Sequence, residues 1–309
     1  MRKPDSRSNR ILRRVLTAAL AFIGISFLSV FLFYVFFFHR TARSSEPQEL
    51  LYQNLSSMVP GGTVERVSFA SDRQQLNGFF LHPENAEGVL VFAMGREAKI
   101  GDHLGETRAF AENGWNVLLY YGTGCGISGG SSMVGLAQGK RDLRAALQFL
   151  SSLDTYRKDS LVVYGHSMGA YAAAAVSDEV PELDGIVCVA GFESSPVLMV
   201  SGAKAKVGPL AYVGAPFIHL FEHMIFGSDA SDSASESLAA SGLPSFLIRF
   251  EDDPVIPPDA DLLANLENKK APNAVLVRLG EPYAEHHNSD ILSGSDVLDS
   301  VLLFLSGCR

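Results

Sequence analysis

The stretch from residue 161 to residue 179 constrains the fold more than any other part of the sequence. It begins with the apolar run Leu-Val-Val-Tyr, which is typical of a buried strand, and ends in an alanine-rich segment that favours a helix. Residues 165–169 lie between them and read Gly-His-Ser-Met-Gly, a G-x-S-x-G pattern. A serine at such a strand-to-helix turn adopts a strained backbone conformation that exposes its hydroxyl above the sheet edge. The pattern therefore predicts that Ser167 is a reactive side chain.

The same G-x-S-x-G pattern occurs a second time, at residues 126–130. This copy follows a glycine-rich turn and runs into Gly-Gly-Ser-Ser, so it has neither the strand before it nor the helix after it. A short pattern is informative only in its structural context. We therefore expect Ser128 to be a structural serine.

Composition limits the classes of protein to which the chain can belong. The 309 residues, 47% of them hydrophobic, suffice for one large α/β domain with an appendage. The net charge of −9 combines +7 in the first 43 residues with −16 in the remainder, and an acidic body disfavours nucleic acid as a partner. The three cysteines have no metal-binding spacing and leave at least one unpaired, so they predict no disulfide framework.

Residues 15–38 form an uninterrupted apolar run of 24 residues without a charge. At ~1.5 Å per residue, a helix of this length spans a bilayer core of ~30 Å with some tilt, whereas a cleavable signal peptide has an apolar core of only ~7–15 residues. Basic residues are concentrated before the run, so the positive-inside rule predicts a cytoplasmic tail at residues 1–14. The sequence thus predicts a single-pass membrane anchor with the rest of the chain on the opposite side.

The remainder of the chain alternates between strand and helix patterns. Residues 39–61 are polar and turn-rich, as in a linker, and a strand hairpin follows with its turn at residues 71–73. Six continuous apolar runs are typical of parallel strands covered on both faces, at 89–94, 116–121, 161–164, 185–190, 245–250 and 274–279. Helical patterns lie between or after them, at 103–113, 136–153, 168–179, 259–269 and 290–305. This alternation predicts an α/β fold with a mostly parallel central sheet and helices on both faces.

An insertion at about residues 192–241 interrupts the alternation. Apolar side chains recur in it at helical spacing from residue 217 to residue 225. We expect a helical cap over the strand ends, where open α/β sheets bind ligands. From this apolar stripe, Phe217, Phe221 and Met224 are predicted to contact an apolar part of a substrate.

Two further loops complete a possible reaction centre. A serine is a weak nucleophile unless a base removes its proton and an acid orients that base. An acidic loop follows the run that ends at Phe250, and a loop with adjacent histidines follows the run that ends at Leu279. The order serine, acid, histidine is the one that a nucleophile at a strand-to-helix turn requires. The candidates are Asp252 or Asp253 for the acid, and His286 or His287 for the base.

This arrangement resembles the alpha/beta-hydrolase superfamily of serine hydrolases over residues 62–309, in the layout of its membrane-anchored members. The family's acid commonly lies in a D-x-x-V/I-P-like loop and its base in an H-N-like loop, which implies Asp253 and His287 here. The resemblance implies an oxyanion hole made by the backbone N–H groups of Met168 and Arg96. Met-Gly-Arg at residues 94–96 replaces the usual His-Gly-Asn, but a backbone N–H does not depend on the side chain.

The resemblance implies a membrane-anchored serine hydrolase that cleaves an ester, thioester or amide through an acyl-enzyme. It would need no cofactor or metal and would act on a small-molecule or acylated substrate with an apolar acyl part. A serine peptidase of the same fold is the nearest alternative, since the same triad cleaves amides. Two others are a catalytically inactive binding module and a zinc hydrolase that uses the H-x-x-E-H pattern at residues 219–223.

Overall fold

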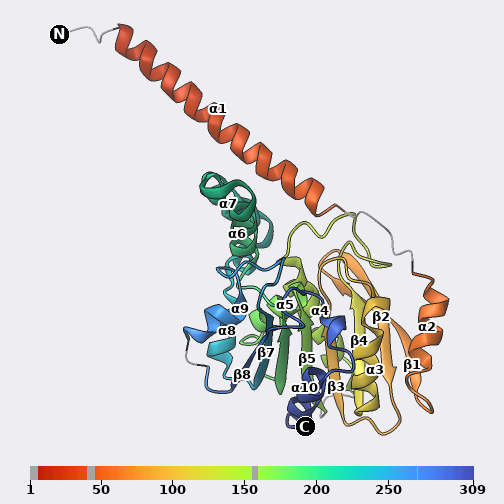
Figure 1. Cartoon of the computed structure of the whole chain (residues 1–309). Coiled ribbons are helices and arrows are strands. Elements are labelled where there is room, and N and C mark those ends of the chain that lie inside the picture. Colours follow the sequence, from red (N-terminus) through yellow and green to blue (C-terminus); the bar gives the residue numbers. More distant parts are fainter. Residues whose placement is uncertain (1–5, 40–45, 155–158, 270) are drawn as a thin grey trace.

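A computed structural model of the chain describes residues 6–39, 46–154, 159–269 and 271–309 (Figure 1). Parts of the predicted basic tail and linker, residues 1–5 and 40–45, lie outside this range. The centre is an eight-stranded sheet in the order β1-β2-β4-β3-β5-β6-β7-β8, in which β1, β2 and β4 pair antiparallel and the remaining pairs are parallel. The predicted α/β architecture is confirmed. The strands are β1 (Thr63–Ser71), β2 (Gln74–His82), β3 (Gly88–Ala93), β4 (Trp115–Tyr121), β5 (Ser160–His166), β6 (Gly185–Val189), β7 (Ser245–Phe250) and β8 (Ala274–Leu279).

Helices cover both faces of the sheet, which explains why β3, β4 and β6 are buried at every position and read as continuous apolar runs. One apolar layer contains side chains of α2 (Gln48–Ser56), α3 (Leu104–Glu112) and α10 (Asp296–Ser306). The opposite layer contains α4 (Gln138–Ser151), α5 (Met168–Ala175), α8 (Ala234–Ser241) and α9 (Leu262–Glu267). The helix-forming stretches of the sequence therefore pack beside the sheet on both of its faces, as crossover connections require.

Two helices begin later than the sequence pattern predicts, because polar side chains cap them. Asp261 accepts a hydrogen bond from the Ala264 N–H at 2.8 Å, so α9 begins at Leu262. Ser295 caps α10 in the same way through the Leu298 N–H, and residues 289–292 form a separate 3₁₀ turn. The shift leaves the predicted histidine loop longer and outside any regular helix.

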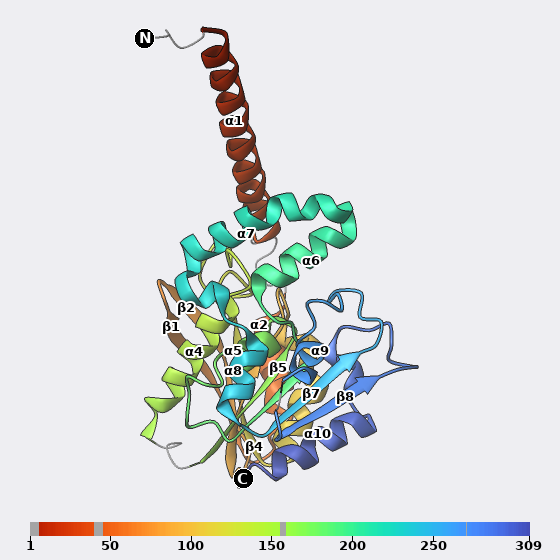
Figure 2. The same cartoon turned by 90° about the vertical axis from the view of Figure 1, so that its left-hand side faces the viewer.

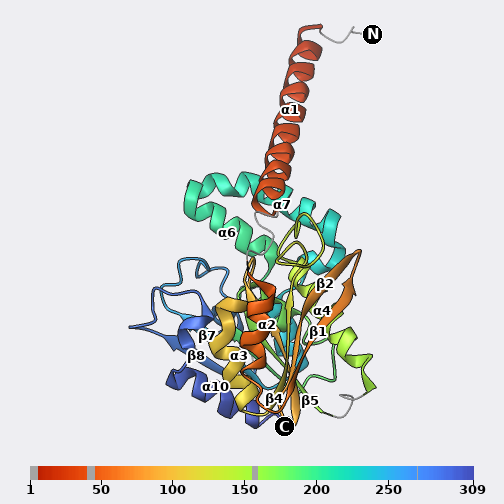
Figure 3. The ribbon, with the colours of Figure 1, turned by 90° about the vertical axis from the view of Figure 1, so that its right-hand side faces the viewer.

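The N-terminal helix α1 (Ser6–Phe37) extends away from the sheet (Figure 1). Its segment Asn9–Phe37 is long and apolar enough to cross a membrane, and it is the one helix among the described residues with that property. The inserted helices α6 (Ser195–Val207) and α7 (Ala211–Phe226) form a hairpin, and the end of α1 packs on α7 (Figures 2 and 3). The third inserted helix, α8, packs beside the sheet on α5 and α9, so only α6 and α7 project from it.

Candidate active site

Ser167 lies at the sharp turn between β5 and α5, with φ +53° and ψ −113°. Its N–H donates to the Val189 carbonyl at 2.8 Å, which ties the turn to β6. A Cβ on Gly169 would lie 1.8 Å from the Ala93 carbonyl oxygen, and one on Gly165 would lie 2.4 Å from the Gly169 oxygen. Both glycines are therefore needed for the turn to pass between β3 and α5. The close packing around them offsets the strain of the Ser167 backbone.

The acid and histidine loops meet Ser167 at the carboxyl edge of the sheet. His287 Nε2 lies 2.9 Å from Ser167 Oγ, and His287 Nδ1 lies 2.8 Å from Asp253 Oδ2. The hydrogen-bonded chain thus runs through Asp253 and His287 rather than through their neighbours Asp252 and His286. Because Nδ1 faces a carboxylate, it carries the proton, and Nε2 is left to accept the hydroxyl proton of Ser167.

The Asp253 carboxylate is held from both sides. Its Oδ1 accepts hydrogen bonds from the N–H groups of Val255 and Ile256, at 2.7 and 3.0 Å, while Oδ2 faces His287. The side chain is 2% exposed, so water does not compete for these contacts. The Pro-Val-Ile sequence after Asp253 thereby fixes the orientation of the acid.

The loop that carries Arg96 lies beside Ser167. A Cβ built on Gly95 would be 3.4 Å from Ser167 Cβ, and the loop closes through a hydrogen bond from the Ala98 N–H to the Gly95 carbonyl. Met168 is the first residue of α5, where a backbone N–H has no partner within the helix. The two segments predicted to form an oxyanion hole are therefore adjacent to the serine.

His166 is a site residue that the sequence analysis did not single out. Its Nε2 lies 2.9 Å from the backbone carbonyl of His287, and since a carbonyl only accepts, Nε2 is the donor. Burial, followed by the nearby His287 and His103, lowers the pKa of His166 to about 3, which keeps the ring neutral. A histidine between a glycine and the serine of the turn was visible in the sequence, but its partner comes from a loop 121 residues later.

A buried polar chain continues beyond His166. The His103 ring lies 5.8 Å from the His166 ring, and its Nδ1 lies 2.8 Å from a carboxylate oxygen of Glu106. The other oxygen of Glu106 accepts a hydrogen bond from the Tyr164 hydroxyl at 2.8 Å, and burial, followed by the charge of Glu106, raises the pKa of Tyr164 well above its usual value. The floor of the site is therefore a set of buried groups joined by hydrogen bonds.

A cavity of about 570 Å³ opens beside Ser167. Its lining is mostly polar and includes the carboxylates of Glu97, Asp102 and Asp290 and the guanidinium of Arg96. Phe217, Phe221 and Met224, predicted to bind an apolar part of the substrate, are not among the lining residues found in the described part of the chain. Phe221 instead packs against α1, and Met224 is 67% exposed, so their role in substrate binding stays a prediction.

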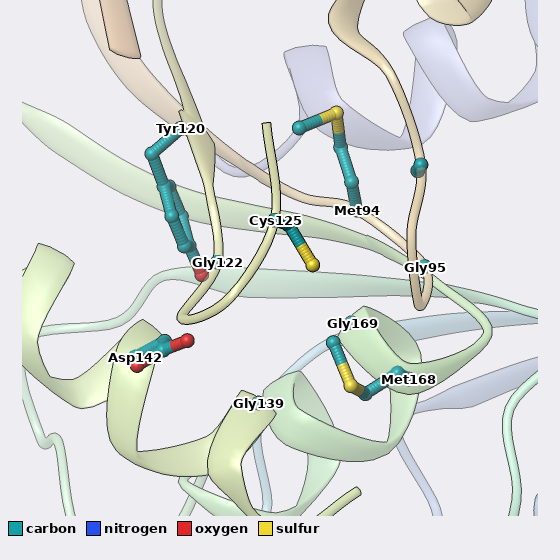
Figure 4. Close-up of a pocket in the computed structure, with 10 residues that line it drawn as sticks. Met94, Gly95, Tyr120, Gly122, Cys125, Gly139, Asp142, Met168 and Gly169 are labelled. Carbon is teal, nitrogen blue, oxygen red and sulfur yellow. The ribbon is translucent and has the colours of Figure 1, made fainter. Parts of the chain in front are cut away.

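A second, smaller cavity lies behind Gly95 and Met168 (Figure 4). Cys125 and Met168 point into it, and the hydroxyl of Tyr120 lies near Asp142 at its edge. Its volume is about 20 Å³, which is room for roughly one water molecule.

The second G-x-S-x-G pattern and the H-x-x-E-H pattern lie outside this site. The Ser128 hydroxyl is buried, donates to the Tyr121 carbonyl at 2.5 Å and accepts from the Asn77 N–H at 2.8 Å. In the H-x-x-E-H pattern, Glu222 is fully buried and accepts a hydrogen bond from Ser195, whereas His219 and His223 are exposed. The carboxylate therefore lies in the interior, whereas the two imidazoles lie at the surface.

The strand order, the serine after β5, and the acid and histidine after β7 and β8 are the arrangement of the alpha/beta-hydrolase fold. The chain has that fold, and the matching family model and the structural neighbours support an enzyme of the serine-hydrolase class. Residues 84–220 match a protein-family model described as "Serine aminopeptidase, S33". No curated protein sequence matched the chain.

Solved structures with the same fold agree with this assignment. An esterase from Pyrococcus furiosus is 19% identical with a TM-score of 0.66, covering 87% of this chain and 98% of its own. An alpha-beta hydrolase from Vibrio vulnificus is 16% identical with a TM-score of 0.63, covering 86% and 88%. A Pyrococcus horikoshii acylaminoacyl peptidase is 14% identical with a TM-score of 0.56, covering 79% of this chain and 41% of its own. At these identities, the likeness concerns the fold.

Proposed function

We propose that this protein hydrolyses an ester, thioester or amide through a Ser167–His287–Asp253 triad. The observation that carries the proposal is the pair of hydrogen bonds through His287, at 2.9 Å to Ser167 and 2.8 Å to Asp253. Three groups from distant parts of the chain meet in the order and orientation that nucleophilic catalysis by serine requires.

In the proposed reaction, Ser167 Oγ attacks the substrate carbonyl carbon while His287 Nε2 takes the hydroxyl proton. The carbonyl oxygen becomes negatively charged and accepts hydrogen bonds from the Met168 and Arg96 N–H groups. His287 then gives its proton to the leaving group, which yields the acyl-enzyme. A water molecule, deprotonated by His287, releases the acid and restores Ser167. Asp253 stays ionised and stabilises the imidazolium in each step.

The cavity lining favours a substrate with a polar group near the scissile bond. Asp102 and Asp290 are exposed at the cavity, and Glu97 lies 3.2 Å from the guanidinium of Arg96. This surplus of negative charge disfavours anionic substrates and suits neutral or cationic ones. An acyl-chain-length series of esters measures separately how much an apolar acyl part contributes.

Aminopeptidase activity is the second candidate. The matching family model is described as "Serine aminopeptidase", and a free amino terminus is cationic, as the carboxylates at the cavity would favour. Hydrolysis of aminoacyl p-nitroanilides but not of their N-acetylated forms would favour this candidate over an esterase. The reverse preference would favour ester hydrolysis.

We further propose that α1 anchors the protein in a membrane with its N-terminus in the cytoplasm and the hydrolase domain on the opposite side. The length and apolar character of Asn9–Phe37 support the anchor, and the basic residues before the apolar run support the orientation. Protease protection of the hydrolase domain in sealed vesicles tests the orientation.

The decisive experiment treats the full chain with a serine-reactive fluorophosphonate probe and follows hydrolysis of p-nitrophenyl esters. The unaltered protein should be labelled and active, and Ser167→Ala should be neither. Ser128→Ala is the matched control, because it changes the serine of the second G-x-S-x-G pattern. Equal labelling of the unaltered protein and Ser167→Ala would overturn the triad proposal.

A further inference from the structure

The end of α1 is held on α7, the second helix of the α6–α7 hairpin, by specific contacts. The ring of Phe221 in α7 packs against Phe27, Phe31 and Tyr34 of α1, with ring centres 4.6–6.4 Å apart. The Tyr34 hydroxyl donates to Glu222 at 2.5 Å, and that carboxylate is fully buried. A polar contact in an otherwise apolar interface fixes how the two helices meet, because other packings would remove the Tyr34 hydrogen bond and leave the buried carboxylate with the one from Ser195.

These contacts set the depth of α7 relative to a membrane that α1 crosses. Phe27 and Phe37 are ten residues apart, which is ~15 Å along a helix and about the thickness of one leaflet of a ~30 Å core. Large apolar side chains remain exposed on α1 up to its end, at Phe33, Phe36 and Phe37. The segment of α1 that contacts α7 is therefore the segment expected in the leaflet nearest the hydrolase domain.

The hairpin also carries an exposed apolar surface, which we call the hairpin patch. Its side chains are between 41% and 67% exposed and lie at the turn of the hairpin and along one side of α7. The hairpin patch consists of Val207, Leu210, Tyr212, Val213, Leu220 and Met224. Exposed apolar surfaces of this kind mark sites that are covered in the working protein.

The orientation of α7 indicates that the bilayer covers the hairpin patch. Figures 2 and 3 show α7 running crosswise to α1 at the end of α1 nearest the sheet. A helix crosswise to a membrane-spanning helix lies along the plane of the bilayer, as interfacial amphipathic helices do. The hairpin is thus at the depth and in the orientation at which its exposed apolar side chains meet lipid.

We propose that the α6–α7 hairpin is a second membrane-contacting element, with the hairpin patch buried in the leaflet nearest the hydrolase domain. This inference rests on the proposed anchoring by α1, and it does not depend on the triad. It has a consequence for the reaction, because Arg96 at the cavity stacks on Phe37 at 4.4 Å. With α1 and the hairpin both in the leaflet, the cavity beside Ser167 is held at the membrane surface, where it can receive substrates from the bilayer.

The test places tryptophan at single exposed positions of the full chain and measures quenching by brominated phosphatidylcholine in reconstituted vesicles. The native Trp115 is the only tryptophan and is 1% exposed, so its signal can be subtracted. Leu210→Trp and Leu220→Trp probe the hairpin patch, and either alone suffices if the other fails to fold. Ile25→Trp probes the anchor, and Leu303→Trp, on α10, is the control for a surface exposed to water.

We expect brominated lipid to quench the tryptophans at positions 25, 210 and 220 strongly and the one at 303 very little. Quenching at position 25 with hairpin tryptophans that respond only to aqueous acrylamide would overturn the inference and leave the anchor intact. Hairpin tryptophans that resist both quenchers would indicate a second protein copy over the patch, which also overturns it. Absence of quenching at position 25 would remove the anchor and this inference together. Fluorophosphonate labelling of each variant reports separately on the folded site and the triad.

Discussion

The two G-x-S-x-G segments have the same pattern but opposite surroundings. Ser167 follows a strand, begins a helix and directs its hydroxyl to the imidazole of His287. Ser128 lies in a glycine-rich loop, where its buried hydroxyl joins the Tyr121 carbonyl to the Asn77 N–H. The second position differs as well, since His166 is buried whereas Ile127 is 42% exposed. A serine becomes a candidate nucleophile through the groups that its fold brings to it.

Exchanging serine for alanine in both segments gives the largest predicted contrast. Ser167→Ala should lower ester turnover on the order of 10⁶-fold, because the attacking atom is lost, with little change in the melting temperature. Ser128→Ala should keep turnover within a few-fold of the unaltered protein. Steady-state hydrolysis and thermal unfolding of the two variants measure both quantities. Turnover that depends on Ser128 and not on Ser167 would reverse the comparison.

The next largest effect concerns Asp253, whose carboxylate contacts the histidine beside Ser167. Asp253→Asn should lower kcat by about 10⁴-fold, because an amide no longer holds His287 in the tautomer that accepts the Ser167 proton. Asp252→Asn is the matched control, since Asp252 is exposed and adjacent in sequence. Equal losses in the two variants would indicate a general effect of the acidic loop, and the assignment of Asp253 would fail.

His166 should contribute through position rather than chemistry. In His166→Phe, the His287 carbonyl loses its buried donor, a cost of about 1–3 kcal/mol, so kcat should fall roughly 10–100-fold with KM little changed. His166→Gln retains an N–H donor and should recover part of the loss. Ile127→Phe changes the equivalent position of the second segment and should leave kcat unaffected. If kcat of His166→Gln is no higher than that of His166→Phe, the loss of activity does not come from the hydrogen bond to the His287 carbonyl.

Ser128 should matter for stability. Ser128→Ala leaves the buried Tyr121 carbonyl and Asn77 N–H without the hydroxyl, which should lower the free energy of unfolding by about 1–3 kcal/mol. Urea unfolding followed by circular dichroism measures the difference. A change no larger than that of Ser131→Ala, an exposed serine of the same loop, would show that these two hydrogen bonds contribute little.

The last prediction is a pH dependence specific to the first segment. Burial lowers the pKa of His166 from its ordinary value of 6.5 to about 3 in the folded protein, so between these values the unfolded chain binds a proton that the folded chain does not. His166 therefore stabilises the fold above about pH 6.5, and the stability falls by up to about 1.4 kcal/mol per unit as pH drops below it. His166→Gln should flatten this part of the stability profile, whereas Ile127→Gln should not.

The parts of the molecule that follow from local pattern were predictable from the sequence. The parallel strands are continuous apolar runs, and Asp253 and His287 each follow one of them, so the carboxyl edge of the sheet brings them to Ser167. The partner of His166 was not predictable, because it is a backbone carbonyl in a loop without regular structure. Nor was the packing of Phe221 on α1, since its helical spacing predicts an apolar face but not which surface covers that face.

The stacking of Arg96 on Phe37 links the two halves of the chain in a way that matters for enzymology. The Arg96 guanidinium lies 4.4 Å from the Phe37 ring and 3.4 Å from its carbonyl oxygen. A shortened protein that begins after α1 would lose both contacts and the aromatic cover of Phe221. The Arg96 side chain, in the loop next to Ser167, would then be in contact with water instead of with the Phe37 ring. Rate constants measured on such a fragment would therefore differ from those of the chain that includes α1.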